Sequence, residues 1–255
     1  MKLTFLGSGN VATHLSRALH AAGHDIVQIF SRTDTHASQL ATIIGAEPIT
    51  SVADIDTSAD CYIYCLRDEV LQDFIRLMPP LPNAVHLHTA GSMPLDIFAG
   101  CQEHYGVLYP MQTFSKDAIV DFCHLPIFVE AHDQLALEWA MTMARQLSDN
   151  VHSVNSEQRE RLHVAAVFAC NFTNHMYAQC QRILAEAGLP FEVMLPLIDV
   201  TAQKVHKLPP TQAQTGPAAR HDTKIIAKHI NMLSDKTQKQ IYELISNSII
   251  EGQKK

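Results

Sequence analysis

The 255-residue sequence lacks any apolar run of the roughly 18 residues that a membrane-spanning helix requires. Its N-terminus leads directly into a strand pattern at 2–6, without the charged, apolar and small-residue regions of a signal peptide. Its six cysteines form no Cys-x-x-Cys pair, so we expect buried, reduced thiols. These absences predict a cytoplasmic protein with no membrane partner.

Basic charge is also scarce, with 19 Lys and Arg against 26 Asp and Glu and a formal net charge of -7. No basic stripe offsets this balance, which argues against nucleic acid as a partner. Histidine is abundant, at 15 residues, yet there is no His-Glu-x-x-His motif and no Cys/His set with zinc spacing. We therefore expect no metal. Hydrophobic residues make up 47% of the chain, which is enough to form a hydrophobic core.

Short apolar strands alternate with helical segments through the first part of the chain. A strand at 3–6 runs into a glycine-rich turn, a helix at 11–22 ends at Gly23, and a second strand follows at 26–30. Further strands are expected at 61–66, 84–88, 106–109, 127–130 and 151–154, and further helices at 37–44 and 135–147. This alternation predicts βαβ units and an α/β fold with a Rossmann-type parallel sheet.

After about residue 155 the strand-like runs stop and helical spacing takes over. Helices are expected at 156–188, 191–206, 221–233 and 235–250, the last with Ser234 or Asp235 as its N-cap. A length of 255 residues favours two domains over one. We predict a Rossmann-like cofactor-binding domain at 1–154 and an all-helical domain at 155–255.

The turn after the first strand fits the pattern Gly-x-Gly-x-x-Ala, and its residues are Gly7, Ser8, Gly9, Asn10, Val11 and Ala12. The first glycine permits a tight turn, the second lets the backbone approach a pyrophosphate, and the alanine allows close contact between helix and sheet. The phosphates would lie against the N-terminus of the following helix, where free N–H groups and the helix dipole favour an anion. The strand, turn, helix and second strand have the spacing of a dinucleotide-binding site.

The end of the second strand favours NADP over NAD. In NAD-binding proteins, an Asp or Glu at this point hydrogen-bonds the ribose 2′-hydroxyl. The sequence instead has Ser31, Arg32 and Thr33, with no acidic residue before Asp34. The planar fork of Arg32 suits a phosphate, and the two hydroxyls offer further donors. Arg32 as an ordinary surface arginine is the alternative.

Several segments together resemble one family. They are the glycine turn with Asn10, the Ser31-Arg32-Thr33 stretch, Leu-His-Thr-Ala-Gly-Ser at 87–92, Tyr-Pro-Met-Gln-Thr-Phe at 109–114, and Gln-Thr-Gly-Pro-Ala-Ala-Arg at 214–220. The chain resembles, over essentially its whole length, the Rossmann-like and DUF2520 domain-containing NADP oxidoreductases. Its first half is also similar to pyrroline-5-carboxylate reductase and F420-dependent NADP oxidoreductase, and its second half to the helical domains of the 6-phosphogluconate dehydrogenase superfamily. The resemblance implies a homodimer with the substrate between a nucleotide domain and a helical domain.

In an open α/β sheet, ligands bind beyond the carboxyl ends of the strands. We therefore expect the nicotinamide end of the cofactor near two strand ends, and the candidate contacts are Cys65, Leu66, His88, Thr89 and Gly91. Arg67 and Asp68 follow the first of these ends, either as part of the site or as a surface pair.

The helix from Ser156 has an apolar middle that we expect to be buried, interrupted by a seam of polar residues. The seam consists of His163, Asn171, Asn174 and His175, which helical spacing brings to one side. Related dehydrogenases carry a lysine and an asparagine for the substrate on this helix, which implies that His163 takes the basic position and Asn171 orients the substrate. The seam could instead bond a neighbouring helix or a dimer partner.

A third candidate is Arg220, which follows a loop rich in proline and glycine. A helix is expected to open at about Pro217, and its N–H groups with Arg220 would hold a substrate carboxylate or phosphate. A solvated arginine near a helix cap is the alternative.

These residues support two hypotheses. The first is an NADP-dependent oxidoreductase that moves a hydride to or from a C=O or C=N group of a small anionic substrate, with His163, Asn171 and Arg220 as its catalytic residues. His163 is the candidate acid or base, because histidine titrates near neutrality. The second is a non-catalytic NADP-binding sensor or scaffold, since cofactor binding does not require chemistry.

Overall fold

A computed structural model describes residues 1–116 and 118–253 of the chain. The chain forms two compact units, Met1–Cys170 and Asn171–Lys255, which are described separately below. The division falls 16 residues beyond the predicted boundary at 154/155, because the helix that starts at Ser156 belongs with the sheet of the first unit. The predicted boundary does mark the change from strands to helices.

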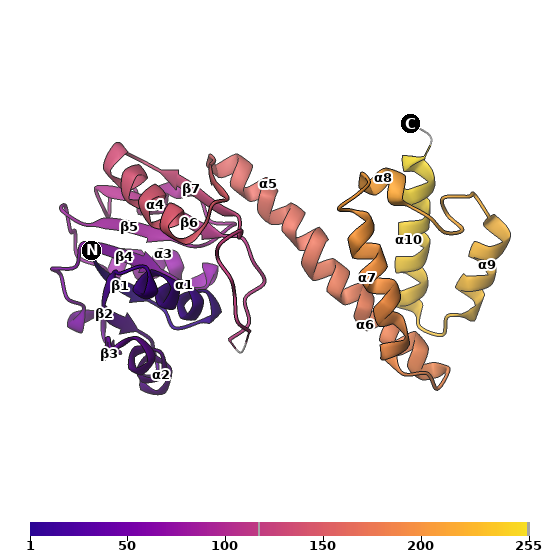
Figure 1. Cartoon of the computed structure of the whole chain (residues 1–255), viewed down its shortest axis with the longest axis horizontal. Helices are drawn as coiled ribbons and strands as arrows, with labels where there is room; N and C mark the ends of the chain where they lie inside the picture. The colour runs from indigo at the N-terminus through magenta and orange to yellow at the C-terminus, as the bar shows by residue number, and fades with distance from the viewer. Residues whose placement is uncertain (117, 254–255) are drawn as a thin grey trace. The chain divides into compact units, whose positions relative to one another are not determined.

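The first unit contains an eight-stranded sheet in the order β3-β2-β1-β4-β5-β6-β7-β8 (Figure 1). Its strands are β1 (Lys2–Leu6), β2 (Asp25–Phe30), β3 (Glu47–Ile49), β4 (Cys61–Tyr64), β5 (Val85–His88), β6 (His104–Pro110), β7 (Ile127–Ala131) and β8 (Val151–Ser153). The Rossmann-type α/β prediction is confirmed, although the sequence analysis missed the short β3.

The prediction of a parallel sheet is wrong at one junction. Strand β7 pairs antiparallel with β6, with Pro110 opposite Ile127, whereas β8 is parallel to β7. A parallel neighbour needs a crossover, usually through a helix. The described residues between β6 and β7 contain no helix, and the chain turns back beside β6. The amino end of β7 therefore lies at the same sheet edge as the carboxyl ends of β1 to β6.

Helices cover both faces of this sheet. One apolar cluster joins the strands to α1 (Asn10–Ala21), α2 (Asp34–Ile44) and α4 (Gln134–Leu147), and a second joins them to α3 (Asp68–Leu77), which the sequence analysis had not assigned. Alternate residues of one strand serve the two faces: Ile63 lies in the first cluster, and Tyr62 and Tyr64 lie in the second. This double cover explains the unbroken apolar runs of the central strands.

The predicted helix from Ser156 is α5 (Ser156–Ala166), a π-helical segment at Val167–Phe172, and α6 (Thr173–Glu186). A capping box between Asn155 and Gln158 starts it. The expected burial of its apolar middle is wrong for the single chain, because Val164 is 57% exposed and Phe168 is 65% exposed.

The second unit contains α6, α7 (Leu195–Lys204), α8 (Pro210–Ala213), α9 (Thr223–Met232) and α10 (Lys236–Gly252) (Figure 1). The side chain of Asp235 caps α10 by accepting from Gln238 N, as predicted. The prediction of a helix from Pro217 is wrong. Residues 217–221 form a turn that ends at His221, with φ +54°, and α9 begins only after Asp222 supplies its cap. Among the described residues, no helix is long and apolar enough to cross a membrane.

Candidate functional site

The glycine turn between β1 and α1 has the geometry that a pyrophosphate requires. Gly7 has φ +121°, and a Cβ atom on it would lie 2.3 Å from the carbonyl oxygen of Cys65, so only glycine fits. Gly9 caps α1, and a Cβ atom there would meet nothing within 4 Å. Ala12 is fully buried against the sheet. The first glycine thus serves the fold, whereas the space beside the second is open.

The N-terminus of α1 is free to hold an anion. No side chain caps it, and its first turn contains no acidic residue. The first N–H groups of a helix have no partner within the helix and favour negative charge. Ser8 and Val11 are half-buried beside Gly9, and Asn10 is exposed. The turn therefore fits the two phosphates of a dinucleotide.

The end of β2 lies beside this turn, since Gly7 N donates to the Phe30 carbonyl oxygen at 2.9 Å. Ser31 is buried, and Arg32 and Thr33 are exposed at the N-terminus of α2. The Arg32 guanidinium is therefore accessible to the 2′-phosphate of NADP. These residues fit the cofactor at its adenosine end.

The ends of β4 and β5 lie on the other side of β1. Cys65 and Leu66 are half-buried and Thr89 is buried. Burial raises the pKa of the Cys65 thiol to about 12, although a hydrogen bond from Thr89 opposes the shift. Cys65 is therefore a neutral thiol near pH 7 and not a nucleophile.

His88, a candidate cofactor contact, is enclosed by the protein. Its side chain is fully buried and stacks on Phe98 at 5.9 Å between ring centroids, and Nδ1 accepts from Ala90 N at 3.2 Å. Burial and, to a smaller extent, the Arg159 charge lower its pKa to about 3, against a backbone hydrogen bond with Pro94 that raises it. His88 is therefore a neutral support for the loop after β5, and its direct contact with the cofactor remains a prediction.

A compact polar group forms where β5, β6 and α5 meet. The hydroxyl of Tyr109, from β6, lies 3.3 Å from Nδ1 of His163, from α5. Both side chains close on Gly91, where a Cβ atom would lie 2.7 Å from His163 Nδ1 and 2.9 Å from Tyr109 Oη. Gly91 is therefore required for this approach. The structure brings the predicted His163 and Gly91 together and adds Tyr109, for which the sequence predicts no role.

Arg159, one turn before His163 on α5, holds the same loop in place. Its guanidinium is fully buried and bonds Glu130 Oε2 of β7 from Nε at 3.1 Å and from Nη2 at 2.9 Å. Nη1 donates to the carbonyl oxygens of Ala90, Gly91 and Met93 at 3.0, 3.0 and 2.6 Å. The sequence analysis missed both charged residues, because a strand glutamate and a helix arginine 29 positions apart carry no local signal.

The remaining candidate residues have other surroundings. The Asn10 side chain donates to the Phe114 carbonyl oxygen at 2.7 Å, so it also ties α1 to the connection between β6 and β7. Arg67 pairs with Glu69 at 3.7 Å, and the Asp68 carboxylate accepts a hydrogen bond from Ser92. The surface pair of Arg67 with Asp68 is therefore not formed.

The predicted polar seam is divided between the two units. His163 is half-buried in the first unit. Asn171, Asn174 and His175 are exposed in the second, so they are not buried groups in this chain. Arg220 is also exposed in the second unit. The roles of Asn171 and Arg220 therefore remain predictions.

Family models match both halves of the chain. Residues 2–87 match the model described as NADP oxidoreductase coenzyme F420-dependent, and residues 125–249 match a domain of unknown function, DUF2520. No curated protein matches the sequence.

Solved structures match the whole chain. A protein from Bacteroides fragilis described as "putative NADP oxidoreductase BF3122" is 46% identical, with 98% of each chain covered and a TM-score of 0.90. An imine reductase from Myxococcus stipitatus in complex with NADP+ is 16% identical over 98% of this chain and 92% of that one, with a TM-score of 0.68. 1-Pyrroline-5-carboxylate reductase from Streptococcus pyogenes is 11% identical over 100% and 99%, with a TM-score of 0.66. The last two show a shared fold.

The open glycine turn, the basic end of β2 and these matches define an NADP-dependent oxidoreductase. More particularly, the chain belongs to the family of NADP oxidoreductases that carry a DUF2520 domain after the F420-dependent-type NADP oxidoreductase domain.

Proposed function

We propose that the protein reduces a C=O or C=N group of a small anionic substrate, or oxidises the corresponding alcohol or amine. Bound NADPH supplies a hydride to the substrate carbon, and a proton must reach the oxygen or nitrogen. In this proposal residues 1–154 bind the cofactor and residues 155–255 supply substrate and dimer contacts. The six free cysteines favour action in the reducing cytoplasm.

The observation that carries this proposal is the pairing of Tyr109 with His163 over Gly91. The pair lies at the carboxyl edge of the sheet, where the loops after β4 and β5 provide the predicted nicotinamide contacts. An imidazole at this edge can donate or accept a proton in the reaction we propose. We assign the proton transfer to His163.

The hydrogen bond with Tyr109 fixes the orientation of this imidazole. Burial raises the pKa of the Tyr109 phenol above its usual value, against an opposing effect of the Arg159 charge, so the phenol keeps its proton at neutral pH. In protonated His163, Nδ1–H donates to the Tyr109 hydroxyl oxygen, and Nε2–H faces the substrate. Nε2 passes its proton to the substrate and leaves a neutral imidazole with its remaining proton on Nδ1, so Tyr109 acts as a positioning residue.

We propose two further substrate contacts, Arg220 and Asn171, both in the second unit. Arg220 is exposed and carries a permanent positive charge, which suits a carboxylate or phosphate on the substrate. Asn171 offers an amide that both donates and accepts. Both assignments depend on the proposal that the substrate is anionic. The panel of compounds that tests His163 also tests them.

Steady-state NADPH oxidation with a panel of keto acids and cyclic imines tests the proposal. We expect turnover with at least one compound, and a fall in kcat of about 100-fold or more in His163→Gln, within the usual contribution of an acid–base residue. Tyr109→Phe should lower kcat less and shift the alkaline limb of its pH profile, because the proton donor must be protonated for reduction. NADPH binding by both variants, measured by calorimetry, should equal that of the wild type.

Two outcomes would contradict this assignment. Full activity of His163→Gln would remove that residue from the mechanism. NADPH binding without oxidation of NADPH by any compound, at any pH tested, would favour a binding-only sensor or scaffold.

We further propose that the protein is a homodimer formed through its second unit. In this unit Leu184 and Ala218 are the described hydrophobic residues that are buried. Large apolar side chains are instead exposed on every main helix, including Ile183, Leu197, Ile225, Met232 and Leu244. Exposed apolar surface of this extent is typical of an interface.

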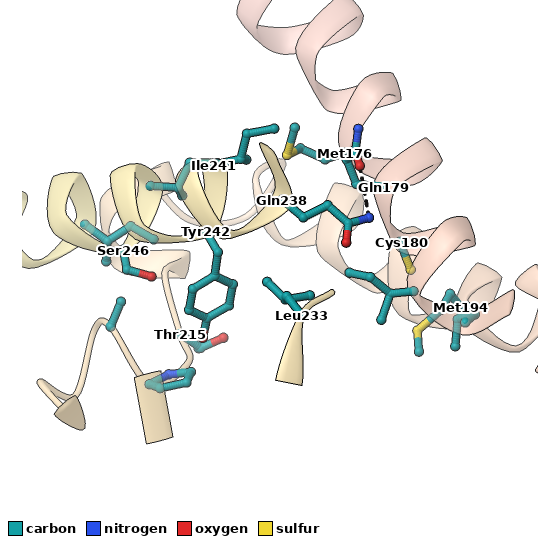
Figure 2. Close-up of a pocket in the computed structure, with 16 residues that line it drawn as sticks. Met176, Gln179, Cys180, Met194, Thr215, Leu233, Gln238, Ile241, Tyr242 and Ser246 are labelled. Carbon is teal, nitrogen blue, oxygen red and sulfur yellow. Dashed lines mark hydrogen bonds between the residues drawn. The ribbon is translucent and has the colours of Figure 1, made fainter. Parts of the chain in front are cut away.

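A cavity of about 430 Å³ lies between α6 and α10, so the apolar side chains of the second unit are also incompletely packed against one another (Figure 2). Its walls are mainly apolar, with Met176, Ile241 and Met194 around the hydrogen bond between Gln238 and Gln179, which is 3.2 Å long. In a two-fold symmetric dimer, the second copy presents the same helices, so the exposed apolar side chains of both copies are buried against each other.

A further inference from the structure

We propose that Cys123, His124 and Asp149 form a binding site for a thiophilic divalent cation of the zinc class. Among the described residues, this set has donor atoms that lie within 4.8 Å of one another and that include a thiol, an imidazole and a carboxylate. Zinc takes these three ligand types, and three protein ligands leave a fourth position for water. No ion is present in the structure.

The backbone holds the two segments of the site together. Asp149 N donates to the Cys123 carbonyl oxygen at 2.9 Å, and the Ser148 hydroxyl donates to the carbonyl oxygens of Cys123 at 3.2 Å and Leu125 at 2.7 Å. Cys123 N donates to Asp121 Oδ1 at 2.9 Å. The chain positions of the ligands are therefore fixed before a metal binds, which lowers the entropy that binding removes.

The side chains already converge. Nδ1 of His124 lies 3.0 Å and 2.9 Å from the two carboxylate oxygens of Asp149. Ligand bonds to zinc are about 2.0–2.3 Å long, so tetrahedral donors lie about 3.5 Å apart. All three side chains are exposed, and small rotations about their side-chain bonds bring the donors to this spacing.

The thiol decides which cation the site selects. Mg²⁺ and Ca²⁺ prefer sets of oxygen ligands, whereas a thiolate with an imidazole favours zinc. Cys123 is one of two exposed cysteines, with Cys170, so its sulfur is accessible to a dissolved ion.

The bound ion would fasten the connection between β6 and β7 to the start of β8. The same connection reaches the cofactor turn through Phe114, whose carbonyl accepts from Asn10, and Ser115, whose carbonyl lies 2.8 Å from His14 Nε2. The site is separate from the proton-transfer pair of Tyr109 and His163, and its expected effect is on the stability of this connection. The sequence predicts no metal, and this proposal departs from that prediction, because Cys123 and His124 are adjacent and Asp149 follows 25 positions after His124, which is not a zinc spacing.

The test uses the untagged, reduced full-length chain, freed of metal by chelation and titrated with Co²⁺ and then Zn²⁺. We expect one equivalent of Co²⁺ to produce the near-ultraviolet band of a thiolate–cobalt bond, and Zn²⁺ to remove it. Cys123→Ser should abolish the band, and Asp149→Asn should weaken Zn²⁺ binding about tenfold or more, as loss of a ligand does. Cys170→Ser is the matched control, an exposed thiol outside the set, and should bind as the wild type does.

Either of two results would overturn the proposal: no thiolate band in the wild type at stoichiometric Co²⁺, or a band that persists in Cys123→Ser. Circular dichroism of each variant shows that it is folded, because all three ligands are surface side chains. Zn²⁺ should also raise the Tm of the wild type and not that of Cys123→Ser, since a ligand that binds only the folded state stabilises it.

Discussion

At the scale of single residues, we propose that the choice between NADP and NAD depends on Arg32. Its side chain is exposed at the end of β2, next to the turn proposed to bind the phosphates. In Arg32→Ala, a charge-assisted bond to the 2′-phosphate is lost, worth about 1.5–3 kcal/mol. We expect the Kd for NADPH to rise about 10- to 100-fold, and the Kd for NADH to stay the same.

Calorimetry with both cofactors measures this change. Arg76→Ala is the control, because Arg76 is an exposed arginine on α3 whose surface pair with Asp73 lies 3.8 Å apart. If Arg32→Ala keeps the preference of the wild type for NADPH over NADH, the assignment of Arg32 is wrong.

Residue by residue, the sequence predicted the candidate site unevenly. Gly7, Gly9 and Arg32 follow from a local pattern, because the turn and the strand end lie within one βαβ unit. Tyr109 and Arg159 could not be assigned from such a pattern. Tyr109 reaches His163 across 54 positions, and Arg159 meets Glu130 across 29, so each contact exists only after the sheet and α5 have packed.

At the scale of elements, substitutions of the two glycines in the β1–α1 turn should have different effects, one on NADP affinity and the other on stability. Gly9→Ala meets open space at an ordinary φ of −77°, so it should fold as the wild type does and lower NADP affinity tenfold or more by blocking the phosphates. Gly7→Ala places a Cβ atom 2.3 Å from the Cys65 carbonyl at φ +121°, and should lower the free energy of unfolding by about 1–3 kcal/mol or more.

Urea denaturation and calorimetry on both variants test this pair. Unchanged NADP binding by a folded Gly9→Ala variant would show that the phosphates do not lie on this turn. Wild-type stability of Gly7→Ala would contradict the close approach to Cys65.

Strand β5 carries two buried histidines that should make stability depend on pH. Burial lowers the pKa of His86 and of His88 to about 3. A histidine with a lowered folded-state pKa stabilises the fold fully above its ordinary value of about 6.5, and the stabilisation is lost as pH falls toward 3. The free energy of unfolding should therefore decrease below pH 6.5, by up to about 1.4 kcal/mol per pH unit for each histidine.

Urea unfolding between pH 7.5 and 4.5 measures this slope. His88→Leu removes one titrating group and should make the decrease shallower, whereas His20→Gln, at an exposed position on α1, should leave it unchanged. A slope in His88→Leu equal to that of the wild type would exclude His88 as a cause.

At the scale of the whole molecule, the helical unit should make the protein a dimer. We expect light scattering to give twice the chain mass of 28.3 kDa. Leu244 is 72% exposed on α10, and Leu244→Glu should raise the dimer dissociation constant at least tenfold, because an unpaired charge would be buried. Leu77→Glu, on α3 of the first unit and 66% exposed, is the matched control.

A monomeric wild type at micromolar concentration would contradict the dimer. Equal dissociation constants for Leu244→Glu and Leu77→Glu would place the interface away from α10.

Apart from β3, α3 and α8, the sequence by itself determined the order of strands and helices, together with the glycine turn and the Asp235 cap of α10, because each depends on neighbours a few residues away. Only the tertiary structure decided that β7 runs antiparallel to β6, that Arg159 is buried on Glu130, and that Tyr109 meets His163. Those features depend on which strands pair and which faces bury one another. The free energy that stabilises these features comes from contacts between segments that are far apart in the sequence. A pattern of neighbouring residues therefore does not predict them.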